Sequence, residues 1–113
     1  MSVDRDVLTL RQMIDAAEAI LEFTKDGRDE FFSDRRTRDA VIRNLEVLGE
    51  AAKRLSPATR DASPGVRWRD IAGLRDFVIH RYEWVDFQEI WRVVEQDLPP
   101  LLESLRRIAK ARS

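Results

Sequence analysis

Residues 39–55 read DAVIRNLEVLGEAAKRL, and their apolar side chains recur at every third or fourth position. This spacing places the apolar side chains on one side of a helix and predicts a helix over about residues 34–55. Gly49 lies within that helix at a cost of roughly 1 kcal/mol relative to alanine, which predicts a close approach by a second helix. The apolar stripe consists of Val41, Leu45, Leu48, Ala52 and Leu55.

The segments before this helix show the same periodicity. They predict a helix over residues 4–24, after which Gly27 is placed to take a left-handed conformation. A short turn over residues 29–33 is expected to put Phe31 and Phe32 over the core. The beginning of the chain therefore predicts one long helix that packs against the helix of residues 34–55.

The segments that follow alternate between periodic stretches and helix breakers. Residues 56–65 predict a loop with one turn, and residues 68–80 predict a third helix. Asp86 is placed to cap a fourth helix. Because prolines lack a backbone N–H, the pair at residues 99–100 is expected to kink or break that helix before a last segment over residues 101–111.

Length and composition limit the fold and the compartment. The chain has 113 residues, of which 43% are hydrophobic, and this suits one ordinary domain over residues 1–113. Four or five helices joined by short loops predict an all-α, antiparallel up-and-down bundle. No apolar run is long enough to span a membrane, and the acidic start of the chain lacks the apolar segment of an export signal. We therefore expect a cytoplasmic protein with no membrane partner.

The residue types exclude several kinds of chemistry. The chain has no cysteine, and its one histidine, His80, cannot form a multi-histidine metal site within one chain. We therefore expect no metal and no cofactor. The net charge of −1 argues against binding nucleic acid by bulk electrostatics. All basic residues except Lys25, Lys53 and Lys110 are nevertheless arginines, whose planar fork suits phosphate, although genomic base composition also explains that excess.

Residues 73–82, GLRDFVIHRY, gather the polar residues that are able to do chemistry. Asp76 and His80 are four residues apart and share one helix face, whereas Arg75 and His80 are separated by about 140° on a straight helix. Arg75 and His80 converge only if the helix ends near Ile79 or if a second chain completes the site.

These residue types suit cleavage of RNA without a metal. His80 can give or take a proton near neutral pH, Arg75 can hold a phosphate, and Asp76 can orient His80 and raise its pKa. The ribose 2′-OH then attacks the adjacent phosphate. The alternative is structural: His80 caps the C-terminus of its helix, where the helix dipole favours a cation, and Arg75 pairs with an acid.

The spacing Arg75-x4-His80-x-Tyr82 resembles the R-x4-H-x-Y signature of the HepT-like branch of the HEPN superfamily. Residues 39–55 resemble the second helix of that family, and residues 68–75, WRDIAGLR, resemble the start of its third helix. With shorter matches, the resemblance covers nearly the whole chain. Those shorter matches lie at residues 85–86 and 97–99.

The resemblance implies a metal-independent ribonuclease toxin encoded beside a minimal nucleotidyltransferase antitoxin. It implies a homodimer in which the R-x4-H pairs of two subunits face each other across a cleft, with Arg75 and His80 at the matching positions. Tyr82 matches the tyrosine to which the antitoxin attaches AMP. Asp76 replaces a frequent asparagine and keeps a polar group there, whereas Arg81 replaces a small residue and either contacts phosphate or crowds the cleft.

We therefore predict a homodimeric endoribonuclease toxin in which Arg75, Asp76 and His80 act on RNA. One alternative is a non-catalytic helical scaffold that binds a nucleotidyltransferase or its substrate. Another is an adaptor bundle with no nucleotide chemistry. A scaffold has no need of a titrating histidine, so the role of His80 separates the first two hypotheses.

Overall fold

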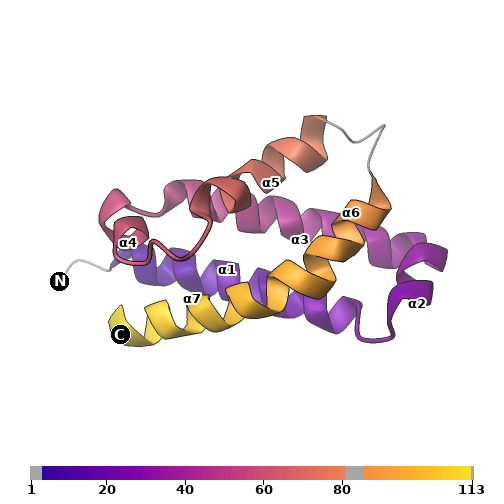
Figure 1. Cartoon of the computed structure of the whole chain (residues 1–113), viewed down its shortest axis with the longest axis horizontal. Coiled ribbons are helices and arrows are strands. Elements are labelled where there is room, and N and C mark those ends of the chain that lie inside the picture. Colours follow the sequence, from indigo (N-terminus) through magenta and orange to yellow (C-terminus); the bar gives the residue numbers. More distant parts are fainter. Residues whose placement is uncertain (1–3, 81–85, 113) are drawn as a thin grey trace.

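The computed structural model describes residues 4–80 and 86–112, and for residues 75–80 it describes only the course of the helix. Within these residues every regular element is helical, and successive long helical runs point in opposite directions (Figure 1). The predicted all-α, antiparallel up-and-down bundle is confirmed. The elements are α1 (Arg5–Phe23), α2 (Arg28–Ser33), α3 (Arg35–Arg54), α4 (Pro57–Asp61), α5 (Trp68–His80), α6 (Phe87–Arg92), the π-helical turn η2 (Val93–Asp97) and α7 (Leu98–Arg112).

The helices begin and end close to the predicted residues. α1 and α3 each start one residue after an aspartate, Asp4 and Asp34, whose side chain accepts the backbone N–H two residues later. The turn expected in residues 56–65 is the helix α4, which Ser56 caps. No helix in the described ranges is long and apolar enough to cross a membrane.

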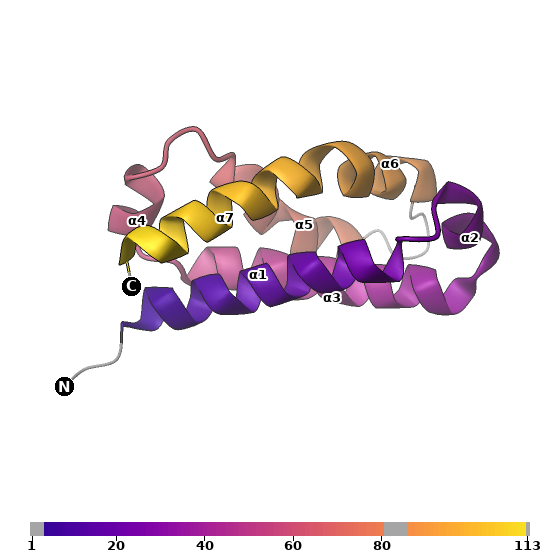
Figure 2. The same cartoon turned by 90° about the horizontal axis from the view of Figure 1, so that it is seen from below.

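The core forms along α3, which packs against both α1 and α5, while α1 also packs against α7 (Figures 1 and 2). Every member of the apolar stripe predicted for residues 39–55 is at most 2% exposed. Gly49 is buried on the same helix. Phe31 of α2 is fully buried, as expected, and Phe32 is partly buried against the core.

The connection from α1 to α2 differs from the prediction for Gly27. Its φ of 95° is positive, but its ψ of −174° is extended, so Gly27 does not have the left-handed helical conformation that ends many helices. Only glycine adopts this backbone region without strain, because it lacks a Cβ. Gly27 precedes α2, whereas α1 ends at Phe23 and is capped by Thr24, whose hydroxyl donates to the Ile20 carbonyl at 2.8 Å.

In the last helical run, the backbone hydrogen-bonding pattern changes just before the two prolines in the sequence rather than at them. The Leu98 N–H donates to the Val93 carbonyl, five residues earlier, which defines the π-helical turn η2. Pro99 and Pro100 then lie in the first turn of α7. A proline in a regular helix clashes with the carbonyl four residues earlier, and the wider turn relieves that clash. The helix is therefore not broken at the prolines but passes through a π turn just before them.

Asp6 joins α1, α4 and α7 at the end of the bundle where α1 begins and α7 ends (Figure 1). Its buried carboxylate accepts hydrogen bonds from the hydroxyl and backbone N–H of Ser56 and from the hydroxyl of Thr59, and it lies 3.8 Å from the Arg112 guanidinium. Burial raises the pKa of Asp6, but the hydrogen bonds and the Arg112 charge outweigh burial and lower that pKa below its usual value.

Replacing Asp6 by asparagine is expected to lower the free energy of unfolding at neutral pH by about 1–3 kcal/mol, because two hydroxyls lose a buried charged acceptor. Since the pKa of Asp6 is lower in the folded than in the unfolded chain, its contribution is present above the unfolded-state pKa. That contribution is lost as the pH falls through the folded-state pKa.

Urea unfolding from neutral to acid pH measures both effects. Asp15→Asn, at an exposed position on α1, is the matched control and is expected to change little. An Asp6→Asn protein as stable as the wild type at neutral pH contradicts the assignment. A deficit that does not shrink in acid contradicts it as well.

Candidate active site

Helix α5 carries the predicted active-site residues, and its first turns are firmly anchored. Trp68 is buried, and its indole N–H donates to the backbone carbonyls of Arg60 and Ser63, both at 3.1 Å. Ile71, about one turn later, is also buried. α5 therefore leads from the α4 end of the bundle toward the end where α2 and α6 lie (Figures 1 and 2).

The helix position of Arg75 differs from that of His80. α5 includes His80 and ends there, one residue after Ile79, and the positions of Arg75 and His80 lie about 140° apart on it. At about 100° per residue, position 75 lies on the side of α5 that carries the buried residues Trp68 and Ile71.

The positions of Asp76 and His80 share the other side of α5. These two positions lie on the same face of α5 as Arg69 and Gly73, both of which are exposed. The helix therefore brings Asp76 and His80 to one face and keeps Arg75 about 140° away from His80. The two ways in which Arg75 and His80 can act together, a helix end near Ile79 and completion by a second chain, therefore both stay open.

The other two predicted site residues, Arg81 and Tyr82, lie outside the described residues. For Arg75, Asp76 and His80 the structure describes the helical positions only. The orienting contact of Asp76, the phosphate contact of Arg81 and the attachment of AMP to Tyr82 therefore stay predictions.

An aromatic cluster holds the start of α6, the first described element after the motif. The ring centre of the buried Phe31 lies 5.3 Å from that of Trp91 and 6.3 Å from that of Phe87. The guanidinium of Arg38 lies over the Phe87 ring at 5.1 Å and donates to the backbone carbonyls of Phe31 and Phe32. The start of α6 is thus tied to α2 and α3, just as the start of α5 is tied to α4.

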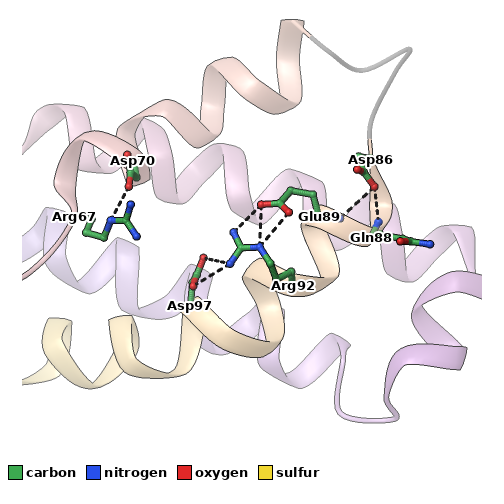
Figure 3. Close-up of polar contacts among 7 residues, drawn as sticks. All are labelled: Arg67, Asp70, Asp86, Gln88, Glu89, Arg92 and Asp97. Atoms are coloured by element: carbon green, nitrogen blue, oxygen red, sulfur yellow. Dashed lines mark hydrogen bonds and ion pairs between the residues drawn. The ribbon is translucent and has the colours of Figure 1, made fainter.

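The predicted helix cap at Asp86 is confirmed. The Asp86 carboxylate accepts the backbone N–H groups of Gln88 at 3.0 Å and Glu89 at 3.2 Å (Figure 3). The side chain of Glu89 pairs with Arg92 at 2.7 Å. The cap and this ion pair together fix the short helix α6.

Arg92 joins the two ends of the π turn, a contact that sequence reasoning missed. Its guanidinium binds Glu89 on one side and lies 3.2 Å from Asp97 on the other (Figure 3). The hydrogen bond from Arg92 lowers the pKa of Glu89, and the hydrogen bond to Glu89 and the charge of Asp97 raise the pKa of Arg92. Residues five apart do not face each other on a regular helix, so the spacing of Arg92 and Asp97 gives no signal in the sequence.

A groove of about 590 Å³ runs between α5 and the η2–α7 segment. Its lining is mainly apolar, with Leu48 from α3 and Leu74 from α5 among the contributors. Its rim carries the Arg92 cluster and the pair of Arg67 with Asp70, whose atoms lie 2.8 Å apart (Figure 3). Arg67 and Arg92 are neutralised by their acids, whereas Arg69, which also lines the groove, forms no ion pair with a described residue.

In the part of the chain that the structure describes, no group of three or more acidic or histidine side chains gathers that could hold a metal ion. The groups that α5 offers at its C-terminal half are a histidine, a carboxylate and an arginine. This set of groups is suited to proton transfer and charge stabilisation at a phosphate.

Comparison with known proteins gives matches along most of the chain. A family model described as ribonuclease HepT-like matches residues 13–108. A Thermococcus cleftensis protein named "Probable ribonuclease HepT" is 36% identical over 102 residues, which cover 89% of this chain and 93% of that protein. A Methanocaldococcus jannaschii protein named as a "Putative RNase" is 37% identical over 99 residues, which cover 86% of this chain and 91% of that protein. No solved structure matches the chain significantly.

Proposed function

Because the chain belongs to the HepT-like ribonuclease family of the HEPN superfamily, we propose that it is a metal-independent endoribonuclease and the toxin of a toxin–antitoxin pair. The observation that carries the proposal is the family match over residues 13–108, in which the R-x4-H motif lies on the continuous helix α5. The relatives named as ribonucleases support the same activity. We treat residues 1–113 as one domain of this kind.

Each residue of the motif has a chemical role in this proposal. His80 takes the proton of the ribose 2′-OH and returns a proton to the leaving 5′-oxygen, acting as general base and general acid. Arg75 holds the scissile phosphate and stabilises the charge that develops on it. Asp76, on the same helix face as His80, orients the imidazole and raises its pKa. Arg81 adds a phosphate contact.

The active form is a homodimer with a two-fold axis at the motif. The support is the regular course of α5 through His80, which keeps the positions of Arg75 and His80 about 140° apart within one chain. In a two-fold cleft, Arg75 of one subunit approaches His80 of the other. Two equivalent sites then form side by side.

The regulatory partner in this proposal is a minimal nucleotidyltransferase that acts as the antitoxin. It transfers AMP from ATP to the hydroxyl of Tyr82 and releases pyrophosphate. Both proteins act in the cytoplasm, where ATP and the RNA substrate are present. The likeness of the motif to the R-x4-H-x-Y signature supports this assignment.

The test is cleavage of total cellular RNA by the purified, unmodified chain in the presence of EDTA. Attack by a 2′-OH leaves one product with a 2′,3′-cyclic phosphate and the other with a 5′-hydroxyl, so we expect these ends and a rate that EDTA does not lower. A rate that EDTA abolishes and Mg²⁺ restores contradicts the metal-independent mechanism. Binding of RNA or of the nucleotidyltransferase without any cleavage identifies the chain as the non-catalytic scaffold.

A further inference from the structure

Arg60 and Arg69 line one open depression of about 490 Å³ beside the start of α5. Arg60 comes from α4 and is partly buried, and Arg69 comes from the first turn of α5 and is exposed. Neither side chain makes a hydrogen bond or an ion pair with any residue in the described ranges. Arg67 and Arg92 in the groove described above have acid partners, whereas Arg60 and Arg69 have none among the described residues, so these two guanidinium groups gain more from a bound anion.

The charges around this depression leave a net positive spot on a chain whose net charge is −1. Asp61 also lines the depression, but it forms no ion pair with either arginine. The neighbouring Arg67 is neutralised by Asp70 at 2.8 Å. Two arginines therefore face one acid here, and both guanidinium groups remain free to bind a phosphate.

The depression is aligned with the motif. His80 follows Arg69 by eleven positions, which corresponds to three turns of α5 and about 16 Å along its axis. Gly73 lies on the same face between them, is exposed, and has nothing within 4 Å of where a Cβ would lie. A glycine within a helix weakens the helix relative to alanine, and no described neighbour requires one here. It leaves the surface between Arg69 and the motif low enough for a strand to lie close to the helix.

We propose that Arg60 and Arg69 form a phosphate subsite for single-stranded RNA, and that the strand runs along α5 from this subsite over Gly73 to the motif. The proposal rests on the ribonuclease function proposed above. The subsite holds a phosphate a few nucleotides away from the scissile one. It contributes affinity and register without reading bases, because phosphate contacts carry no sequence information.

The experiment measures binding apart from cleavage. The probe is a fluorescein-labelled 2′-O-methyl oligouridylate of about 12 nucleotides, which cannot be cut because its 2′ oxygens are blocked. Fluorescence anisotropy gives its affinity for the wild-type protein, Arg60→Gln, Arg69→Gln and the double variant at several salt concentrations. Arg11→Gln is the matched control, since Arg11 is exposed on α1 and has no ion pair with a described residue. Circular dichroism checks that every variant is folded.

We expect the double variant to bind the oligouridylate about tenfold more weakly at low salt, and Arg11→Gln to bind it like the wild type. The slope of log affinity against log salt is expected to become less steep by roughly 0.7 for each arginine of the pair that is removed. Unchanged affinity and slope in the double variant overturn the proposal. An equal loss in Arg11→Gln overturns it too, because the effect is then one of bulk charge.

Three further outcomes separate this subsite from its alternatives. If cellular RNA is not cut but the double variant still loses affinity for the probe, the subsite stands and the nuclease proposal fails. If RNA is cut and the double variant has the KM of the wild type, the subsite fails and the nuclease stands. A double variant that sediments as a monomer while the wild type is a dimer assigns the depression to a subunit interface and overturns the proposal.

Discussion

Replacing His80 by alanine is expected to lower the rate of RNA cleavage by about 10²- to 10⁴-fold, the range that a positioned general acid or base contributes. Arg75→Ala is expected to cost about 10²- to 10³-fold, because it removes the charge that stabilises the transition state at the phosphate. Single-turnover cleavage of a labelled RNA measures both rates. The far-UV circular dichroism of both variants should match the wild type, because the core residues of α5, Trp68 and Ile71, are unchanged.

A site built from residues of two subunits allows a more specific test of the same assignment. If Arg75 and His80 act from different subunits, a mixed dimer of Arg75→Ala and His80→Ala chains contains one intact site and one site that lacks both groups. Mixing the two inactive variants under conditions of subunit exchange should therefore restore cleavage. The control mixes His80→Ala with a chain that carries both substitutions, and it should stay inactive.

Three results count against this assignment. Full activity of His80→Ala removes the histidine from the chemistry and favours the scaffold hypothesis. A mixture that exchanges subunits but recovers no activity places Arg75 and His80 of one chain in the same site. Sedimentation of only a monomer at micromolar concentration removes the dimer on which the composite site depends.

The helices could be predicted from the sequence because helix periodicity and capping are local properties. The stripe in residues 39–55 is buried throughout, and α5 begins and ends at the predicted residues. The cap at Asp86 could also be predicted, since it needs only a side-chain oxygen and two nearby backbone N–H groups.

The features that the sequence did not predict depend on backbone details or on distant residues. Residues 92 and 97 face each other only because the turn between them is π-helical, and their spacing in the sequence does not predict that turn. Asp6 meets Ser56 only after α1 and α4 have packed together. The lack of an acid partner at Arg60 and Arg69 is likewise a tertiary property, because pairing depends on which side chains the fold brings near.

The candidate site also has features that could be predicted from the sequence and one that could not. Its residue types and the R-x4-H spacing are visible in the sequence, as is the angular separation of Arg75 and His80. Whether the helix ends near Ile79 or a second chain completes the site could not be decided from the sequence. The helical positions of Arg75 and His80, about 140° apart on α5, support the two-chain site proposed above.

Attachment of AMP to Tyr82 is expected to abolish RNA cleavage. Tyr82 lies two residues beyond His80 and seven beyond Arg75 in the sequence, so a group on its hydroxyl is tethered close to both. The phosphate of AMP carries a negative charge that pairs with the arginine, and its nucleoside fills the space of the RNA. The modified tyrosine therefore inhibits by occupying the place of the scissile phosphate.

The test uses intact-mass measurement after incubation with the neighbouring nucleotidyltransferase, ATP and Mg²⁺, followed by the cleavage assay. We expect the mass to rise by one or more AMP units while cleavage is lost. Tyr82 is the only tyrosine of the chain, so Tyr82→Phe leaves no second tyrosine to accept AMP. That variant should keep its mass and its activity through the same incubation. An unchanged mass in the wild type, or a mass gain that persists in Tyr82→Phe, contradicts the attachment of AMP to Tyr82. The tyrosine then has a structural role only, with its ring packed at a helix end and its hydroxyl in water.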